Sequence, residues 1–229
     1  MNHALTALPL LERRTLTDAA YAHLCDLLVS GRVAPGEKLS LRDLSEALGV
    51  SVMPVREAVS RLIADRALEV APNRAVRVPI MTRSQFRELS VVRAEVEGWA
   101  AALAASHRSD VHLEAIIAAE AALHRTTAGA DAGEAVPLNR DFHFAIYAAA
   151  GLPTLTAMIG GLWLKAGPVI NLDLRHSRDR LSAGHMLRCH AAALAAIRDG
   201  DAAAARAAIA EDITCAADFI IERGGLPRG

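Results

Sequence analysis

Residues 49–62 read Gly-Val-Ser-Val-Met-Pro-Val-Arg-Glu-Ala-Val-Ser-Arg-Leu, and this stretch decides the fold of the N-terminal third of the chain. Gly49 can end one helix, and Ser51 can cap the next helix, whose first turn tolerates Pro54. The apolar residues that follow have the spacing of a helix with one buried face: Val55, Val59, Leu62 and Ile63. Arg56 then lies on the outward face. The stretch predicts two short helices joined by a tight turn.

Regular patterns extend from this stretch in both directions. Towards the N-terminus we expect a helix from its cap Thr17 to Gly31, and a second helix from its cap Ser40 to Gly49. Towards the C-terminus, residues 68–70 and 76–78 alternate around turn residues and predict a β-hairpin. This order is typical of a winged helix-turn-helix, in which the last helix enters the major groove of DNA and the hairpin contacts the backbone or the minor groove.

The composition narrows the class of protein. With 52% apolar and 22% charged residues among 229, the chain is too hydrophobic for disorder, and it has no run of about 18 apolar residues that could span a membrane. The formal net charge of −1 neither requires nor excludes a local basic face for nucleic acid. Cys25, Cys189 and Cys215 lie far apart without C-x-x-C spacing, so the sequence suggests neither a disulfide framework nor a zinc ribbon. We expect a soluble protein of the cytoplasm.

After residue 81 the sequence becomes rich in Ala, Leu and Ile and predicts helices only. The expected helices cover residues 82–106, 110–127, 134–150, 153–175, 182–198 and 201–223. We therefore predict a mainly α protein with a winged helix-turn-helix domain at 1–81 and a helical-bundle domain at 82–229.

The N-terminal third resembles the DNA-binding domain of GntR-type bacterial transcription regulators. The resemblance rests on the 49–62 stretch, on Pro-Gly-Glu-Lys-Leu at 35–39 and on Leu-Arg-Asp-Leu at 41–44. An Arg such as Arg56 is, taken alone, more often a solvated surface residue, but this surrounding pattern favours a DNA contact. The resemblance implies that Arg42 and Arg56 contact DNA and that Asn73 and Arg74 form the tip of the wing.

Two further residues and two departures bear on this predicted interface. Ser51 and Met53 lie near the end of the helix that enters the groove, and we expect them at the interface. Val52 stands where the family usually has an Arg that contacts bases or phosphates, which puts the usual operator sequence in doubt. Ala75 stands where the wing usually has Gly, and because a positive φ costs more at Ala, we expect the turn to differ locally.

Spacing alone suggests one ligand site in the helical part. Asn139 and His143 are four residues apart and share a helix face. His190 and Asp212 lie at similar distances from the turn at 199–201, so on antiparallel helices they can meet at one level. Two imidazoles, a carboxylate and an amide oxygen suit a divalent transition metal such as zinc, nickel or manganese. The alternative for each imidazole is a half-buried histidine held by hydrogen bonds.

The helical part resembles the FCD effector domain of the FadR branch of GntR regulators, in its shorter, VanR-like six-helix form. The similar segments are 92–97, 139–143 and 190–201. The resemblance implies metal ligands at Asn139, His143 and His190, with Asp212 at a position where His is usual. It also implies that small carboxylate effectors bind beside the metal.

The resemblance further implies that Arg93 grips such a carboxylate in the effector pocket. An intrahelical ion pair of Arg93 with Glu97, four residues on, is an equally good interpretation. Other residues that could line the pocket are Trp163, Lys165 and Arg175, although Trp163 fits the core as well. Cys189 is expected to be a buried apolar side chain.

These observations favour an effector-responsive transcription regulator that binds a pseudo-palindromic DNA operator as a homodimer and responds to a small organic acid. Repression is the commoner sign in the family. One alternative is a regulator that senses the metal itself. The other is a metal-dependent helical enzyme that uses His124, His176 or His185 as a base, but the sequence has no nucleophile elbow, phosphate loop or paired-carboxylate motif. We therefore expect that this protein is not an enzyme.

Overall fold

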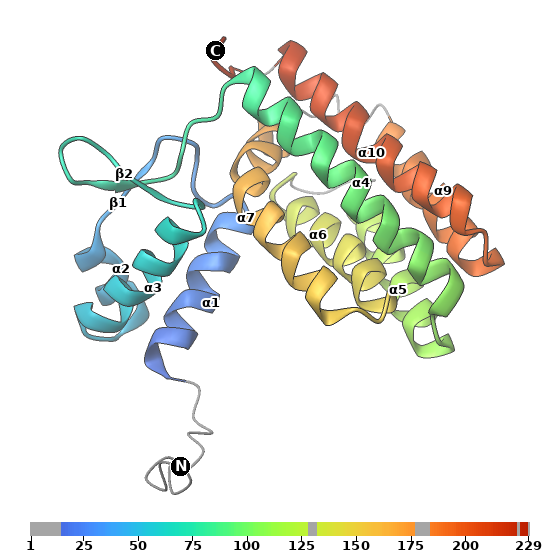
Figure 1. Ribbon diagram of the computed structural model, residues 1–229, viewed down its shortest axis with the longest axis horizontal. Coiled ribbons are helices and arrows are strands. Elements are labelled where there is room, and N and C mark those ends of the chain that lie inside the picture. The colour runs from blue at the N-terminus through green and yellow to red at the C-terminus, as the bar shows by residue number, and fades with distance from the viewer. Residues whose placement is uncertain (1–14, 128–131, 177–183, 224, 229) are drawn as a thin grey trace, which may run out of the picture.

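The computed structural model describes residues 15–127, 132–176, 184–223 and 225–228. Within these ranges the N-terminal part combines helices with a small sheet, and the regular elements after residue 82 are all helices (Figure 1). The predicted fold class is therefore confirmed. None of the helices in the described ranges is both long and apolar enough to cross a membrane.

The N-terminal part has the expected order with one strand added. Its elements are α1 (Leu16–Val29), β1 (Lys38–Leu39), α2 (Leu41–Leu48), α3 (Val52–Ala64), β2 (Glu69–Val70) and β3 (Val76–Arg77). Strand β3 lies in the middle of the sheet and pairs antiparallel with both β1 and β2. The sequence analysis missed β1 because two residues are too few to show alternation. The turn at Gly36, with φ of 82°, brings the backbone N of Gly36 within 2.9 Å of the carbonyl oxygen of Val78.

The predicted caps agree with the structure at α2, and Ser51 occupies the N-cap position of α3 without a capping hydrogen bond from its side chain. Ser40 caps α2 and accepts a hydrogen bond from the backbone N of Asp43, and Gly49 ends α2 in the left-handed conformation with φ of 64°. The prediction of Thr17 as the first cap is wrong, because α1 begins earlier. Thr15 caps α1 in a capping box with Asp18, and the hydroxyl of Thr17 instead donates to Glu57 of α3 at 2.7 Å.

The helical part contains six helices in the described ranges. They are α4 (Arg83–His107), α5 (Asp110–Thr127), α6 (Ala132–Ala149), α7 (Pro153–His176), α9 (His185–Asp199) and α10 (Ala202–Arg223). In Figure 1, α4 and α10 run side by side, and α10 returns along α9 after the turn at Gly200. Pro168 lies inside α7, which continues through it to His176. The expected helix start at 182 lies outside the described residues.

The two parts are in direct contact through α1. The carboxamide N of Asn171, on α7, donates to the carbonyl oxygen of Val29 at the end of α1. Arg140 of α6 pairs with Asp26 of α1 at 3.0 Å. One hydrophobic core runs from the winged-helix part into the bundle, where Trp163 and Tyr147 are its largest fully buried side chains. The first helix of the winged-helix part is therefore held by contacts with both α6 and α7.

Candidate functional site

Helix α3 turns one face inward and presents the other to solvent. Val55, Val59 and Leu62 are buried, whereas Arg56 is exposed and Met53 is 57% exposed. Ser51 occupies the N-cap position, is exposed, and makes no side-chain capping bond, so its hydroxyl can accept another partner. The exposed face of α3 thus carries a guanidinium, a thioether and a hydroxyl near the end that would enter a groove.

The other predicted DNA contacts are exposed as well. Arg42 lies on α2, and Asn73 and Arg74 lie at the tip of the β2–β3 hairpin. Within the described part of the chain, neither Arg42 nor Arg56 forms an ion pair or a side-chain hydrogen bond. Guanidinium groups that form no ion pair within the protein are available for phosphates or base edges.

At the wing tip, a residue other than Ala75 adopts the left-handed backbone conformation. The residue with positive φ is Arg74, at 63°, while the side-chain oxygen of Asn73 accepts from the backbone N of Ala75 at 3.2 Å. The left-handed residue therefore lies directly before the Ala position. Its guanidinium remains at the tip of the hairpin.

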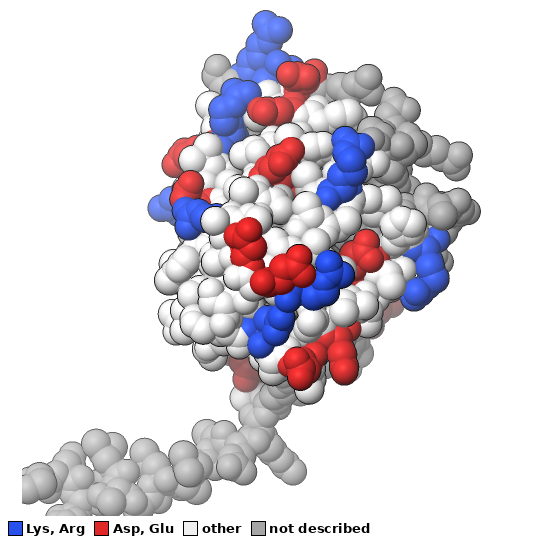
Figure 2. Space-filling model, turned by 90° about the vertical axis from the view of Figure 1, so that its right-hand side faces the viewer, with Lys and Arg blue, Asp and Glu red and all other residues white. Residues whose placement is uncertain are grey.

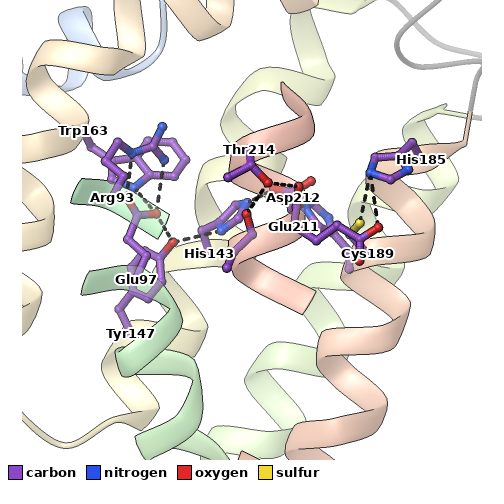
Figure 3. A network of polar contacts seen from close by, with 12 residues as sticks. Arg93, Glu97, His143, Tyr147, Trp163, His185, Cys189, Glu211, Asp212 and Thr214 are labelled. Carbon is purple, nitrogen blue, oxygen red and sulfur yellow. Dashed lines mark hydrogen bonds and ion pairs between the residues drawn. The ribbon is translucent and has the colours of Figure 1, made fainter. Parts of the chain in front are cut away.

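Three of the four predicted metal ligands converge inside the bundle (Figure 3). Nε2 of His143 lies 3.3 Å from Oδ2 of Asp212, and Nε2 of His190 lies 3.5 Å from the same oxygen. His143 comes from α6, His190 from α9 and Asp212 from α10, and all three are buried. The donor atoms of the three residues lie within 4.8 Å of one another. We call this group the buried triad. Asn139 is also buried, one helical turn before His143 on α6.

The hydrogen bonds around His143 define its tautomer. The hydroxyl of Tyr147 donates to Glu97, so its oxygen is left to accept from Nδ1 of His143, 3.0 Å away. A neutral His143 then directs the bare lone pair of Nε2 at the carboxylate of Asp212. Two acceptors face each other across 3.3 Å. A cation between them, either a proton or a metal ion, turns this repulsion into attraction.

His190 also has unused acceptor capacity. Among the described residues, neither ring nitrogen of His190 has a hydrogen-bond partner of good geometry, although the residue is fully buried. Burial holds the pKa of His190 below its usual range, against the pull of Asp212. Burial alone would raise the pKa of Asp212, but the imidazoles of His190 and His143 outweigh it and lower that pKa. Metal binding requires an ionised carboxylate, and the lowered pKa of Asp212 supplies it.

A second layer of polar groups surrounds the triad (Figure 3). Arg93 makes two contacts to Glu97, at 2.6 and 3.1 Å, and the indole N of Trp163 donates to Glu97 at 3.1 Å. Glu97 therefore accepts hydrogen bonds from Arg93, Trp163 and Tyr147, and all four side chains are buried. Burial and the charge of Glu97 raise the pKa of Tyr147 well above its usual value, so the phenol keeps its proton. Arg93 adopts the intrahelical pair that was one of its two interpretations.

The remaining candidates lie elsewhere. Lys165 lines a cavity of about 650 Å³ between α1, α3, α6 and α7, together with Arg66 and Arg140, and not the triad. Cys189 is buried as expected. His124 is exposed on α5, and His185 is half-exposed at the start of α9. The side chains of Arg175 and His176 lie outside the described residues.

Figure 2 shows the face of the helical part that lies on the right in Figure 1. Acidic and basic side chains are interspersed on this face, and none of its drawn areas is dominated by one sign of charge. A surface of this kind does not offer the positive potential that a DNA backbone requires. The exposed guanidinium groups of α2, α3 and the wing provide the better nucleic-acid interface.

Comparison with known proteins agrees with this division into two functional parts. The profile of the gntR family of bacterial regulatory proteins matches residues 16–78, and that of the FCD domain matches residues 88–214. The chain belongs to the GntR family and carries an FCD domain. Its relatives are transcription regulators, and this chain is a DNA-binding regulator and not an enzyme.

The similar proteins include several bacterial regulators. The HTH-type transcriptional regulator McbR of Escherichia coli is 32% identical over 79% of this chain and 81% of its own length. The HTH-type transcriptional repressor GlaR of the same organism is 31% identical over 60% of this chain and 64% of its own. The solved structure of E. coli McbR/YncC superposes with a TM-score of 0.81 at 30% identity, covering 92% of this chain and 99% of that one. A GntR transcriptional regulator from Rhodococcus sp. RHA1 superposes with a TM-score of 0.73 at 25% identity, covering 90% and 98%.

Sequence reasoning missed two residues of the regulator's polar network. Tyr147 was not considered, although it follows His143 by four residues and so shares its helix face. Glu97 was considered only as a partner of Arg93, and nothing in the sequence connects it to α6 or α7. The spacing signal could have identified Tyr147, but Glu97 required the packing of α4 against α6 and α7.

Proposed function

We propose that this regulator binds a pseudo-palindromic operator as a homodimer, as a repressor, and that a divalent metal with a small carboxylate in the FCD domain controls its affinity for DNA. The observation that carries the proposal is the set of unpaired acceptors in the buried triad, one turn of α6 away from a residue that contacts the winged-helix part. Repression is supported by the likeness to GlaR, which is named a repressor.

The metal is supported by the donor set. Two imidazole nitrogens and a carboxylate oxygen converge in a buried space, and Asn139 lies one turn before His143 on the same helix. Zinc, nickel and manganese all accept nitrogen and oxygen ligands, and water can complete their coordination. Asp212 replaces the usual His with an anionic oxygen, which favours the harder ions of this group. A bound divalent ion would supply positive charge where the imidazoles and the carboxylate now face one another.

The carboxylate effector is supported by the charges around the triad. With neutral imidazoles, Arg93 faces two carboxylates, Glu97 and Asp212, so the site carries one excess negative charge and repels an anion. A divalent cation reverses the sign of this charge. We therefore propose that metal binds first and that the organic acid is attracted to it. Arg93 contributes positive charge near the site while it remains paired with Glu97. It would bind the organic acid directly only if the acid displaced Glu97 from this pair.

The route from ligand to DNA runs through α6. His143 belongs to the triad, and Arg140, three residues earlier on the same helix, pairs with Asp26 of α1. A ligand that draws His143 towards Asp212 moves the helix that holds α1, and α1 packs against α3. Ligand binding then biases the orientation of α3 relative to the bundle, which is how two sites become coupled.

The homodimer is supported by an apolar stripe on α4. Val92, Val96, Trp99 and Leu103 follow one another at helical spacing, and Val92 and Trp99 are 43% and 47% exposed. A second copy that covers this stripe would bury it and would place two α3 helices on two half-sites related by the same symmetry.

A regulator that responds to metal alone is the second candidate. The same unpaired nitrogens of His190 and the facing acceptors at His143 favour it, because a cation satisfies them without an organic acid. The two candidates differ in what changes DNA affinity. Metal alone suffices in the second, whereas the first also requires a carboxylate.

The DNA interface is tested with Arg56. Operator DNA is first selected from random sequences by repeated rounds of binding, and affinity is then measured by fluorescence anisotropy. Arg56→Ala should weaken binding by about 1–3 kcal/mol, which is about 5- to 150-fold. Arg61→Ala is the matched control, since Arg61 lies on the same helix but pairs with Asp18 of α1 at 2.9 Å. Equal affinities of Arg56→Ala and the wild type would contradict the proposed interface.

A further inference from the structure

A second group of side chains that could hold a metal ion lies beside the buried triad, and Figure 3 shows His185, Cys189 and Glu211 of this group. His185 and Cys189 are four residues apart on α9, and Glu211 and Cys215 are four residues apart on α10. Residues at this spacing share one face of a helix, and α9 and α10 pack against each other. Two pairs therefore face each other across the helix contact. We call these four residues the outer cluster.

His185, Glu211 and Cys215 lie at distances that suit a shared ion, and Cys189 lies next to His185. Nε2 of His185 lies 3.5 Å from Sγ of Cys189 and 4.0 Å from Oε1 of Glu211. The donor atoms of His185, Glu211 and Cys215 all lie within 4.8 Å of one another. Both cysteines are free thiols. Small movements of side chains would bring these donors to the 2.0–2.3 Å distances typical of zinc ligands.

The outer cluster is also accessible, unlike the triad. The side chain of His185 is 36% exposed and that of Glu211 is 60% exposed, Cys215 is half-buried, and only Cys189 is fully buried. An ion can therefore reach the cluster from solvent and find sulfur donors on its inner side. The proposed function makes no use of these four residues.

We propose that His185, Cys189, Glu211 and Cys215 form a second metal site, selective for a thiophilic divalent cation such as zinc. One imidazole, two thiolates and one carboxylate form a four-ligand set of the kind that tetrahedral zinc prefers, and the sulfur donors distinguish it from the nitrogen and oxygen donors of the triad. This site does not depend on the proposed regulatory function.

The electrostatics of the cluster favour a cation. Glu211 belongs to the cluster, and the carboxylate of Asp212 follows it directly in the sequence. The same carboxylates attract a divalent ion. On binding, each thiol forms a metal–sulfur bond and releases one proton to solvent, so the two cysteines release two protons per ion.

One neighbour competes with the ion. Nη2 of Arg188 lies 3.4 Å from Nδ1 of His185, and a guanidinium can only donate. Coordination through Nε2 places the proton of the neutral imidazole on Nδ1, so Arg188 must turn away when the metal binds. The side chain of Arg188 is exposed. Arg188→Ala should therefore bind the metal more tightly than the wild type.

An ion at the outer cluster would join α9 to α10. These helices carry His190 and Asp212, each next to a residue of the cluster in the sequence: His190 follows Cys189, and Asp212 follows Glu211. Fixing the two helices would therefore fix the distance between two members of the triad.

Cadmium is the probe that separates the two sites. Cadmium bound to thiolate absorbs in the ultraviolet by charge transfer from sulfur, and the triad contains no sulfur. Cd²⁺ is titrated into reduced, full-length protein under a non-thiol reductant, and absorbance is recorded together with protons released. We expect the band to saturate at one ion per chain, with release of two protons. His143→Ala should keep the band.

The cysteine variants decide the assignment. Cys189→Ser and Cys215→Ser should each weaken Cd²⁺ binding about 10- to 100-fold or more, since the loss of an outer-shell partner alone has that effect. Cys25→Ser is the matched control, because Cys25 lies on α1, and it should keep the wild-type band. Circular dichroism verifies the fold of each variant. The proposal is overturned if the wild type shows no band, if Cys25→Ser removes it, or if the Cys189→Ser/Cys215→Ser double variant keeps it.

Discussion

Tyr147 determines which ring nitrogen of His143 faces the triad. Its hydroxyl hydrogen is used on Glu97, so its oxygen accepts the Nδ1 proton of His143 and leaves Nε2 as the acceptor. Tyr147 would then act on a bound metal through His143 and not by touching it. Such outer-shell partners orient ligands and raise their basicity.

Replacing Tyr147 tests this role. Tyr147→Phe removes the hydroxyl and should lower the affinity for Mn²⁺ about 10- to 100-fold, because the imidazole loses its fixed tautomer. Mn²⁺ is chosen since it prefers nitrogen and oxygen ligands and avoids the thiols of the outer cluster. The affinity is measured by isothermal calorimetry. Tyr21→Phe is the control, because Tyr21 donates to Asp65 in the winged-helix part. Unchanged Mn²⁺ affinity in folded Tyr147→Phe would show that Tyr147 does not position His143.

For a single residue, the sequence predicts which face of a helix it occupies more readily than which other residue it contacts. Helical spacing correctly placed Arg56 outside and brought His190 and Asp212 to one level, because both follow from the rise of a helix and the position of a turn. The bidentate pair of Arg93 with Glu97 was one of two open interpretations. The site roles of these residues stay predictions, since spacing reports geometry and not what binds.

Among the elements, α7 shows how small residues let one helix approach another. A Cβ added to Gly167 would lie 3.0 Å from Cα of Val29, on α1, whereas one added to Gly160 would meet nothing within 4 Å. Both glycines lie in the same helix. Only Gly167 is required by the contact between α7 and α1.

The two glycines give opposite expectations for the same substitution. Gly160→Ala should raise the free energy of unfolding by about 0.5–1 kcal/mol, the usual gain for Ala over Gly inside a helix. Gly167→Ala should lower it, because the backbone of α1 has to shift. Urea denaturation followed by circular dichroism measures both. If Gly167→Ala stabilises the protein as much as Gly160→Ala, α1 does not pack against α7 as described.

The elements themselves were predicted well where the pattern was long. The six C-terminal helices came from apolar periodicity and clear breaks, and five of their starts agree within two residues of the expected ones. The incorrect predictions concerned short segments of the chain. Strand β1 has only two residues, and its partner β3 lies far along the chain, while Thr15 and Thr17 are equally good caps until the helix start is known.

For the whole molecule, the apolar stripe on α4 predicts the oligomeric state. Trp99→Asp places a charge in the middle of the stripe and should convert a dimer into a monomer at micromolar concentration, because burial of an unpaired carboxylate is costly. Light scattering after size-exclusion chromatography measures the mass. Met158→Asp, which changes an apolar side chain that is 59% exposed on α7, is the control and should leave the dimer intact. A wild-type protein with the mass of one chain would contradict the proposed dimer.

If ligands of the FCD domain control DNA binding, they must change the affinity of the protein for its operator. This affinity is measured under several ligand conditions on one protein preparation. Anisotropy titrations are made with metal-free protein, with Mn²⁺, and with Mn²⁺ plus each of a series of small carboxylic acids from acetate to citrate. We predict that the operator Kd changes about 5- to 150-fold when the effective ligand is bound, as expected for a coupling of about 1–3 kcal/mol, and that His143→Ala/His190→Ala shows no change. The same operator Kd under every condition, in protein that binds the ligands by calorimetry, would contradict the account.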